Sequence, residues 1–90
     1  PIPKIQKLLS ELGANIKLAR LRRNMSSELA SRRAGISRST LWQIEKGSPN
    51  VAIGAYVNIL FVYNLEKDIK QIAVDDVLGR KLQDIGLTVR

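Results

Sequence analysis

The sequence contains no cysteine and no histidine. Without cysteine, a disulfide scaffold, a thiolate metal site and a thiol redox motif are excluded. Without histidine, the commonest general base and the commonest metal ligand are missing. There is no Gly-rich phosphate loop, and the only adjacent carboxylates, Asp75 and Asp76, are better explained as a helix cap. We therefore expect no enzymatic activity, no catalytic residue, no metal and no cofactor.

Long apolar runs and aromatic residues are also scarce. No apolar run approaches the roughly 20 residues that span a bilayer, and the chain starts without a signal leader. We therefore expect a soluble cytoplasmic protein, associated with a bacterial nucleoid. Ninety residues with 44% hydrophobic content suit one domain, which we expect to have its core at about residues 12–73 and a C-terminal extension at 74–90.

The net charge of +7 is confined to one half of the chain. Residues 1–50 contain ten Lys or Arg and three acidic residues, whereas residues 51–90 contain five of each. A uniform excess could serve solubility alone, but a segregated one indicates a face that binds a polyanion. The alternative is a solvated basic surface without a partner.

Apolar residues recur at helical spacing, which predicts an all-α fold, a compact bundle of about five or six short helices. We expect these helices at residues 4–23, 27–34, 38–46, 52–63, 66–73 and 75–84. Gly13 lies inside the first and is expected to weaken or break it. Residues 87–89 are the only stretch with strand character.

Two of the expected short helices are joined through residues 34–37 in the manner of a helix-turn-helix. Small residues on the first helix, Ala30, Ser31 and Ala34, let the second helix approach closely. Gly35 suits the sharp turn because it tolerates positive φ. Ile36 then fills the angle between the helices.

The second of these helices has a distinct inner and outer face. Leu41 and Ile44, three residues apart, direct its inner face at the core. Its outer face holds Arg38, Ser39, Trp42, Gln43 and Lys46. A polar stripe with an arginine at its N-terminal end is what a helix entering the major groove of DNA needs.

The outer stripe supplies candidates for base contacts. Arg38 can donate a bidentate pair to guanine, and Gln43 can pair in the same way with adenine. Ser39 can bond several base edges or a phosphate. Trp42 can lie against a thymine methyl or a sugar, or instead pack sideways on neighbouring helices without a DNA role.

Other polar residues are candidates for phosphate contacts, beginning with the backbone N–H groups at the start of the expected helix 27–34. The candidate residues are Ser26, Ser27, Arg32, Arg33, Lys46, Ser48 and Asn50. From Arg32 onward, any single one of these residues can instead be a solvent-exposed surface residue without a DNA contact. An acidic residue such as Glu45 is unexpected next to so many candidate DNA contacts. We interpret Glu45 as a structural acid that pairs with Arg20.

Residues 25–47, Met-Ser-Ser-Glu-Leu-Ala-Ser-Arg-Arg-Ala-Gly-Ile-Ser-Arg-Ser-Thr-Leu-Trp-Gln-Ile-Glu-Lys-Gly, resemble the Cro/C1-type (XRE) helix-turn-helix family. The similarity covers about residues 12–65 and implies a lambda-repressor-like fold. It also implies base contacts at Arg38, Ser39 and Gln43, and a bond between Arg20 and Glu45. Ser31 stands where the family usually has alanine, and it is small enough to leave the fold undisturbed.

A narrower resemblance extends over residues 45–56, 60–68 and 75–84, which look like those of HipB-type antitoxins. Such proteins accompany HipA-type kinase toxins, so the resemblance implies a kinase partner and repression of the protein's own operon. In some members a C-terminal strand from each subunit pairs across the dimer, a role that Leu87 and Val89 can fill. The alternative for that tail is a disordered end.

A dimer would place two recognition helices about 34–36 Å apart, matching half-sites one turn apart in a palindromic operator. We expect its interface in the neutral half of the chain, which is rich in large apolar residues. The alternative, which we expect to hold for at least half of these residues, is that they fill the core. The candidates are Tyr56, Ile59, Leu60, Phe61, Tyr63 and Leu65, with Leu87 and Val89 in the tail.

Two other functions fit the same sequence. One is a free-standing, phage-type regulator without a toxin, which shares every DNA contact. The other is a protein-binding adaptor that has lost DNA binding, which the basic half and the polar outer stripe argue against.

Overall fold

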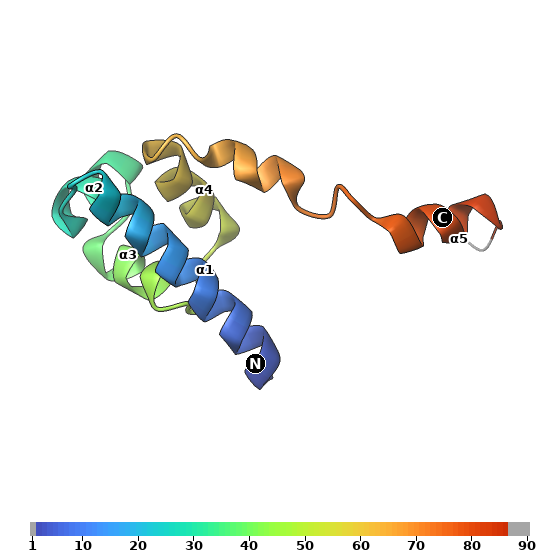
Figure 1. Ribbon diagram of the computed structural model, residues 1–90. Helices are drawn as coiled ribbons and strands as arrows, with labels where there is room; N and C mark the ends of the chain where they lie inside the picture. Colours follow the sequence, from blue (N-terminus) through green and yellow to red (C-terminus); the bar gives the residue numbers. More distant parts are fainter. Residues whose placement is uncertain (1, 87–90) are drawn as a thin grey trace.

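A computed structural model describes residues 2–86, all of whose regular elements are helical. In chain order the elements are α1 (Pro3–Arg22), α2 (Ser27–Ala34), α3 (Arg38–Glu45), α4 (Ile53–Val62), the 3-10 helix η1 (Glu66–Gln71) and α5 (Val77–Asp84). The predicted all-α class is confirmed, with no strand in the described range (Figure 1). The strand expected at residues 87–89 lies outside the described residues.

Side-chain caps begin the two helices of the predicted helix-turn-helix. The Ser26 hydroxyl accepts a hydrogen bond from the Leu29 N–H at 3.0 Å, and the Ser37 hydroxyl accepts one from the Thr40 N–H at 3.0 Å. Gly35 ends α2 with a φ of 69°, which suits a residue without a Cβ. Local chemistry alone therefore defines where α2 ends and α3 begins.

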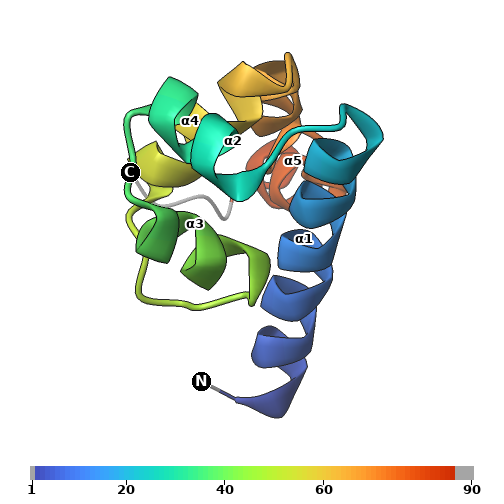
Figure 2. The ribbon, with the colours of Figure 1, turned by 90° about the vertical axis from the view of Figure 1, so that its left-hand side faces the viewer.

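The core is built where four helices meet (Figure 2). The buried side chains are Ile16 and Ala19 of α1, Ala30 and Ala34 of α2, Leu41 and Ile44 of α3, and Tyr56, Ile59, Leu60 and Tyr63 in or just after α4. These residues leave little or no surface exposed, so α3 is held by its inner face and its outer face is left for solvent.

Gly13 does not break α1, contrary to the expectation from its low helix propensity, and the helix continues from Pro3 to Arg22. A Cβ at Gly13 would lie only 2.5 Å from the carbonyl oxygen of Ile44 and 2.7 Å from that of Glu45. Gly13 is therefore needed because the C-terminal end of α3 approaches the backbone of α1 too closely for a side chain. This close approach helps to fix the direction of α3.

Four of the residues proposed for a dimer interface lie in the protomer core. Tyr56 and Leu60 are each 7% exposed, Tyr63 is 1% exposed, and Ile59 has no exposed surface. They belong to the core cluster in which α4 packs against α2. Phe61 points outward and is 68% exposed. Leu87 and Val89 lie outside the described residues.

The bundle ends with η1, and α5 extends away from it as an arm (Figure 1). The helix expected at residues 66–73 forms only as the shorter 3-10 helix η1, and Ala73 just beyond it has a positive φ of 63°. Asp76 is the residue that caps α5, accepting a hydrogen bond from the Gly79 N–H at 3.0 Å. In the described part of the chain, no helix has the length and apolar character to cross a membrane.

Candidate nucleic-acid interface

The outer face of α3 is open to solvent, while its inner face is fully buried. Leu41 and Ile44 have no exposed surface, which anchors the helix. Arg38, Ser39 and Trp42 are all exposed on the opposite side. Gln43, the fourth expected base-contacting residue, is only half-buried and therefore retains an accessible edge. The helix thus presents the expected polar stripe.

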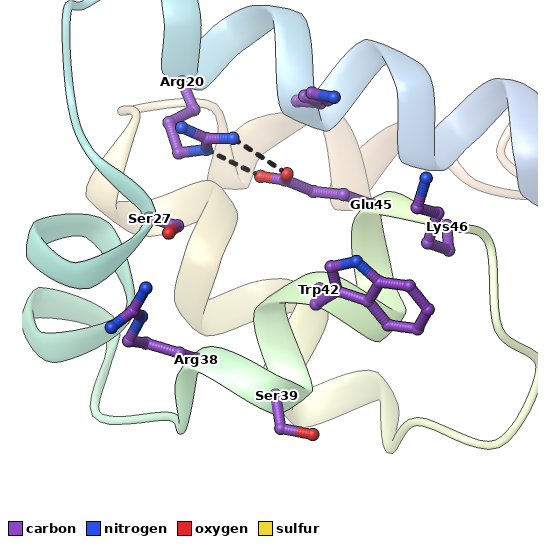
Figure 3. A pocket seen from close by; sticks show the side chains of 8 residues that line it. Arg20, Ser27, Arg38, Ser39, Trp42, Glu45 and Lys46 are labelled. Carbon is purple, nitrogen blue, oxygen red and sulfur yellow. Dashed lines mark hydrogen bonds and ion pairs between the residues drawn. The ribbon is translucent and has the colours of Figure 1, made fainter.

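Side chains from α1, α2 and α3 line a concave surface beside this stripe (Figure 3). Its residues are Lys17, Arg20, Ser27, Arg38, Ser39, Trp42, Glu45 and Lys46. We call it the basic cleft. It brings together three of the proposed base-contacting residues, two of the proposed phosphate-contacting residues and both members of the expected ion pair. Four cations face only one carboxylate there.

Glu45 is occupied by Arg20, as Figure 3 shows. Arg20 Nε donates to Glu45 Oε2 at 2.9 Å, and Arg20 Nη2 donates to Glu45 Oε1 at 3.0 Å. Arg20 Nη1 also donates to the Met25 carbonyl oxygen at 3.1 Å. The side chains of Arg20 and Glu45 are only 11% and 9% exposed. The hydrogen bonds to Glu45 raise the pKa of Arg20. The pair therefore ties α1 to α3 and neutralises the carboxylate that would otherwise repel phosphate.

Trp42 does not pack sideways on neighbouring helices. Trp42 is 62% exposed. The Lys46 ammonium lies 5.6 Å from the centre of the Trp42 ring. At that distance the cation is attracted by the face of the indole. Trp42 is thus free to meet a ligand, with its orientation influenced by Lys46.

The remaining phosphate candidates lie outside the basic cleft. Arg32 and Arg33 are exposed near the end of α2. Asn50 is exposed in the loop before α4, where its N–H donates to the Ser48 hydroxyl at 3.2 Å. Ser26 lies at the start of α2, with its hydroxyl used as the cap. These residues lie close in sequence to those of the basic cleft, but none of them lines it.

Lys17 is a member of the basic cleft that the sequence did not single out. It lies on α1, one helical turn before Arg20, so the two side chains project from the same face of the helix. Once Arg20 is paired with Glu45 of α3, that spacing places Lys17 beside α3 as well. The i, i+3 relation to the expected ion pair was the signal available in the sequence.

Arg23 is a basic residue of the first half that serves the bundle instead of the cleft. Its Nη1 donates to the Ala19 carbonyl oxygen at 2.9 Å and its Nη2 to the Tyr63 carbonyl oxygen at 2.9 Å. Its guanidinium also lies 5.6 Å from the centre of the Tyr63 ring. Not all of the positive charge in residues 1–50 is therefore available to a polyanion.

Residues 2–86 contain no group of three or more His, Cys, Asp or Glu side chains that could hold a metal ion.

A family model described as a helix-turn-helix domain matches residues 11–68, more than half of the chain. No curated protein matches the chain. No solved structure matches it either. The matched region contains α2, the turn at Gly35 and α3, together with all of the residues that line the basic cleft. Domains of this family indicate a DNA-binding regulator and are typically non-enzymatic. The chain therefore belongs to the helix-turn-helix domain family, within its XRE-like group.

Proposed function

We propose that the protein is a sequence-specific transcriptional repressor that binds a palindromic operator as a homodimer and acts as the HipB-like antitoxin of a HipA-type kinase. The observation that carries DNA binding is the basic cleft, where exposed polar residues of α3 lie next to cations from α1 and α3. A helix held by a buried inner face and exposed along a polar outer face suits the major groove.

Base recognition would rest on the outer face of α3. Arg38 begins the helix, where its fork of N–H donors can reach the O6 and N7 atoms of a guanine. Ser39 follows at the same end and can bond a base edge. Gln43 lies one turn further along, where its amide can pair with an adenine. Trp42, exposed between them, would contact a thymine methyl or a sugar.

Phosphate contacts would come from the rim of the basic cleft. Lys17 and Lys46 supply charge from α1 and α3, and Ser27 lies in the first turn of α2. The free N–H groups of that turn add donors suited to a phosphate oxygen. Such contacts set the register of a protein on DNA without reading its sequence, so affinity should fall steeply as salt rises.

The DNA-binding proposal is tested by fluorescence anisotropy with the upstream DNA of its own gene and a scrambled duplex, at several salt concentrations. We expect tight binding to the native DNA alone. Arg38→Ala should lower affinity for that DNA by about 1–3 kcal/mol and leave scrambled DNA unaffected. Lys67→Ala, which removes an exposed cation from η1, is the matched control and should change neither. Equal weak binding to both duplexes would contradict a repressor and favour an adaptor.

The antitoxin role rests on the HipB-like segments at residues 45–56, 60–68 and 75–84. It is tested by co-expressing the chain with the protein encoded beside it and measuring growth and co-purification. A stable complex that relieves growth arrest would support the antitoxin. A neighbouring gene that encodes no kinase-like protein would favour the free-standing regulator, with the DNA contacts unchanged.

A further inference from the structure

The arm helix α5 has an apolar face that no other described part of its protomer covers. Val77, Leu78, Leu82 and Ile85 recur at helical spacing along one side. Their exposed fractions are 47%, 68%, 39% and 66%, and none of the eight residues of α5 is buried. A short amphipathic helix is marginal in water by itself and gains its stability by packing this face on a partner.

One cation interrupts this apolar face. Lys81 is four residues after Val77 and so follows it by about one helical turn. It therefore lies on the same side of the helix, within the arc from Val77 to Leu82. Arg80 and Gln83 project from the other side, where Arg80 pairs with Asp75 at 3.0 Å. A partner surface for α5 should therefore be apolar and should offer one carboxylate.

The bundle carries a groove with that composition, which we call the apolar groove. Its walls come from α1, from the loop before α4, from α4 itself and from η1 with the residue after it, and include Leu12, Ile53, Leu60, Ile69 and Ile72. Ile53 and Ile72 are 67% and 65% exposed although they border an apolar surface. Asp68 is the only charged residue among the described residues that line the groove.

We propose that the apolar groove receives α5 from a second copy of this chain, with Lys81 opposite Asp68. Apolar side chains on both surfaces would leave water together, and the single cation of one surface would meet the single carboxylate of the other. Two copies that exchange the same element in this way form a closed two-fold dimer.

The direction of the arm favours a second copy over the chain's own groove. Ile72 is itself part of the groove, and the chain leads from there away from the bundle to α5 (Figure 1). The molecule measures 51 × 28 × 22 Å, and its Cα radius of gyration is 16.1 Å. A compact chain of this length would have about 12 Å. The apolar face of α5 is thus held where another protomer can meet it.

This inference specifies the contact that would build the dimer of the proposed function. Its test measures association without DNA, so a failure of the dimer contact and a failure of DNA recognition give different results.

The absence of cysteine from the sequence allows a clean cross-linking test. Asp68→Cys and Lys81→Cys are made as two separate single variants, mixed and oxidised. We expect a disulfide-linked species of dimer mass in the mixture, which only contact between two chains can form. Asp68→Cys mixed with Gln83→Cys, whose thiol would face away from the apolar arc, is the matched control and should remain largely monomeric. Absence of the cross-link in the first mixture would overturn the proposal.

A variant with both Asp68→Cys and Lys81→Cys separates the two possible directions. A disulfide formed within one chain, at monomer mass, would mean that α5 folds back on its own groove and would overturn the exchange. No disulfide at either mass would leave the groove for a different polypeptide and would overturn it equally.

Charge reversal gives an independent measurement by analytical ultracentrifugation. Lys81→Glu should weaken dimerisation by about tenfold or more, because it would face Asp68 with a like charge. Adding Asp68→Lys should restore much of the loss, whereas Arg80→Glu, with the same change in net charge, should have little effect. All three positions are exposed in the protomer, and circular dichroism verifies the fold. Equal weakening by Lys81→Glu and Arg80→Glu would contradict the proposed pairing.

Discussion

The bundle from α1 to η1 and the α5 arm are both built from helices with apolar faces. Within residues 2–86, only the bundle covers those faces inside the protomer. Leu41 of α3 has no exposed surface, whereas Leu78 of α5 is 68% exposed. The same contrast holds for the ion pairs. Arg20 and Glu45 form a nearly buried pair, whereas Arg80 and Asp75 form an exposed one. Capping and periodicity therefore specify a helix, while the contribution of that helix to stability depends on the surface against which it packs.

The largest expected effect compares the two ion pairs. Arg20→Ala should lower the free energy of unfolding by about 3–5 kcal/mol, because it leaves the Glu45 carboxylate nearly buried without its partner. Arg80→Ala should cost less than about 1 kcal/mol, since its pair is exposed. Chemical denaturation of both variants checks this difference. An unchanged melting temperature for Arg20→Ala would refute a structural role for the pair.

The second comparison is between two leucines. Leu41→Ala should cost about 2–5 kcal/mol because it leaves a cavity in the core. Leu78→Ala should change the stability of the protomer by no more than about 0.5 kcal/mol. Thermal unfolding at a concentration low enough to keep the protein monomeric measures both. Similar losses under those conditions would mean that α5 is packed within its own chain.

Alkaline pH should destabilise the bundle through Tyr63. Burial raises its pKa to about 12, whereas the unfolded chain titrates near the ordinary value of 10. Between those values the unfolded chain loses its phenolic proton and the folded chain keeps it, so the free energy of unfolding falls as pH rises, by about 3 kcal/mol at most.

Tyr63→Phe is the matched control for this pH effect. In the part of the chain that the structure describes, the buried Tyr63 hydroxyl has no hydrogen-bond partner, so its removal should leave the fold intact. Denaturation curves between pH 9 and about 12 should decline less steeply for this variant than for the parent chain. Identical slopes for the two proteins would assign the alkaline loss to other groups.

The smallest expected effect concerns single phosphate contacts in the basic cleft. Lys17→Ala should weaken binding to native and scrambled DNA alike, and should reduce the slope of log affinity against log salt by about 1. Lys67→Ala, from the neutral half of the chain, should leave the slope unchanged. Anisotropy titrations over a range of salt measure both. A loss confined to the native sequence would make Lys17 part of base recognition instead.

Much of the fold could be predicted from short-range patterns. The limits of α2 and α3 follow from the serine caps at Ser26 and Ser37 and from Gly35, which act within a few residues. The contact between Arg20 and Glu45, 25 residues apart, was predicted from the unexpected acidic charge of Glu45 beside a basic face and from the family resemblance, because no local spacing indicates it. The role of Gly13 was not accessible at all, because it depends on the backbone of α3 approaching from elsewhere in the chain.

The basic cleft, like the fold, could be predicted only in part. The outer stripe of α3 follows from helical spacing, since Leu41 and Ile44 define the inward side. Lys17 joins the basic cleft only because α1 packs beside α3, and Tyr63 is buried only once the helices pack into one core. Sequence spacing places residues on one face of a helix but does not tell which faces will meet.

Neighbours along the chain specify the helices, the turn at Gly35, the polar face of α3 and the segregation of positive charge, so these features could be predicted before the structure was known. The packed bundle is needed to see which apolar faces are buried, which cations remain free for a polyanion and where α5 lies. Burial and charge neutralisation depend on distances between helices, and these are set only when the whole bundle packs.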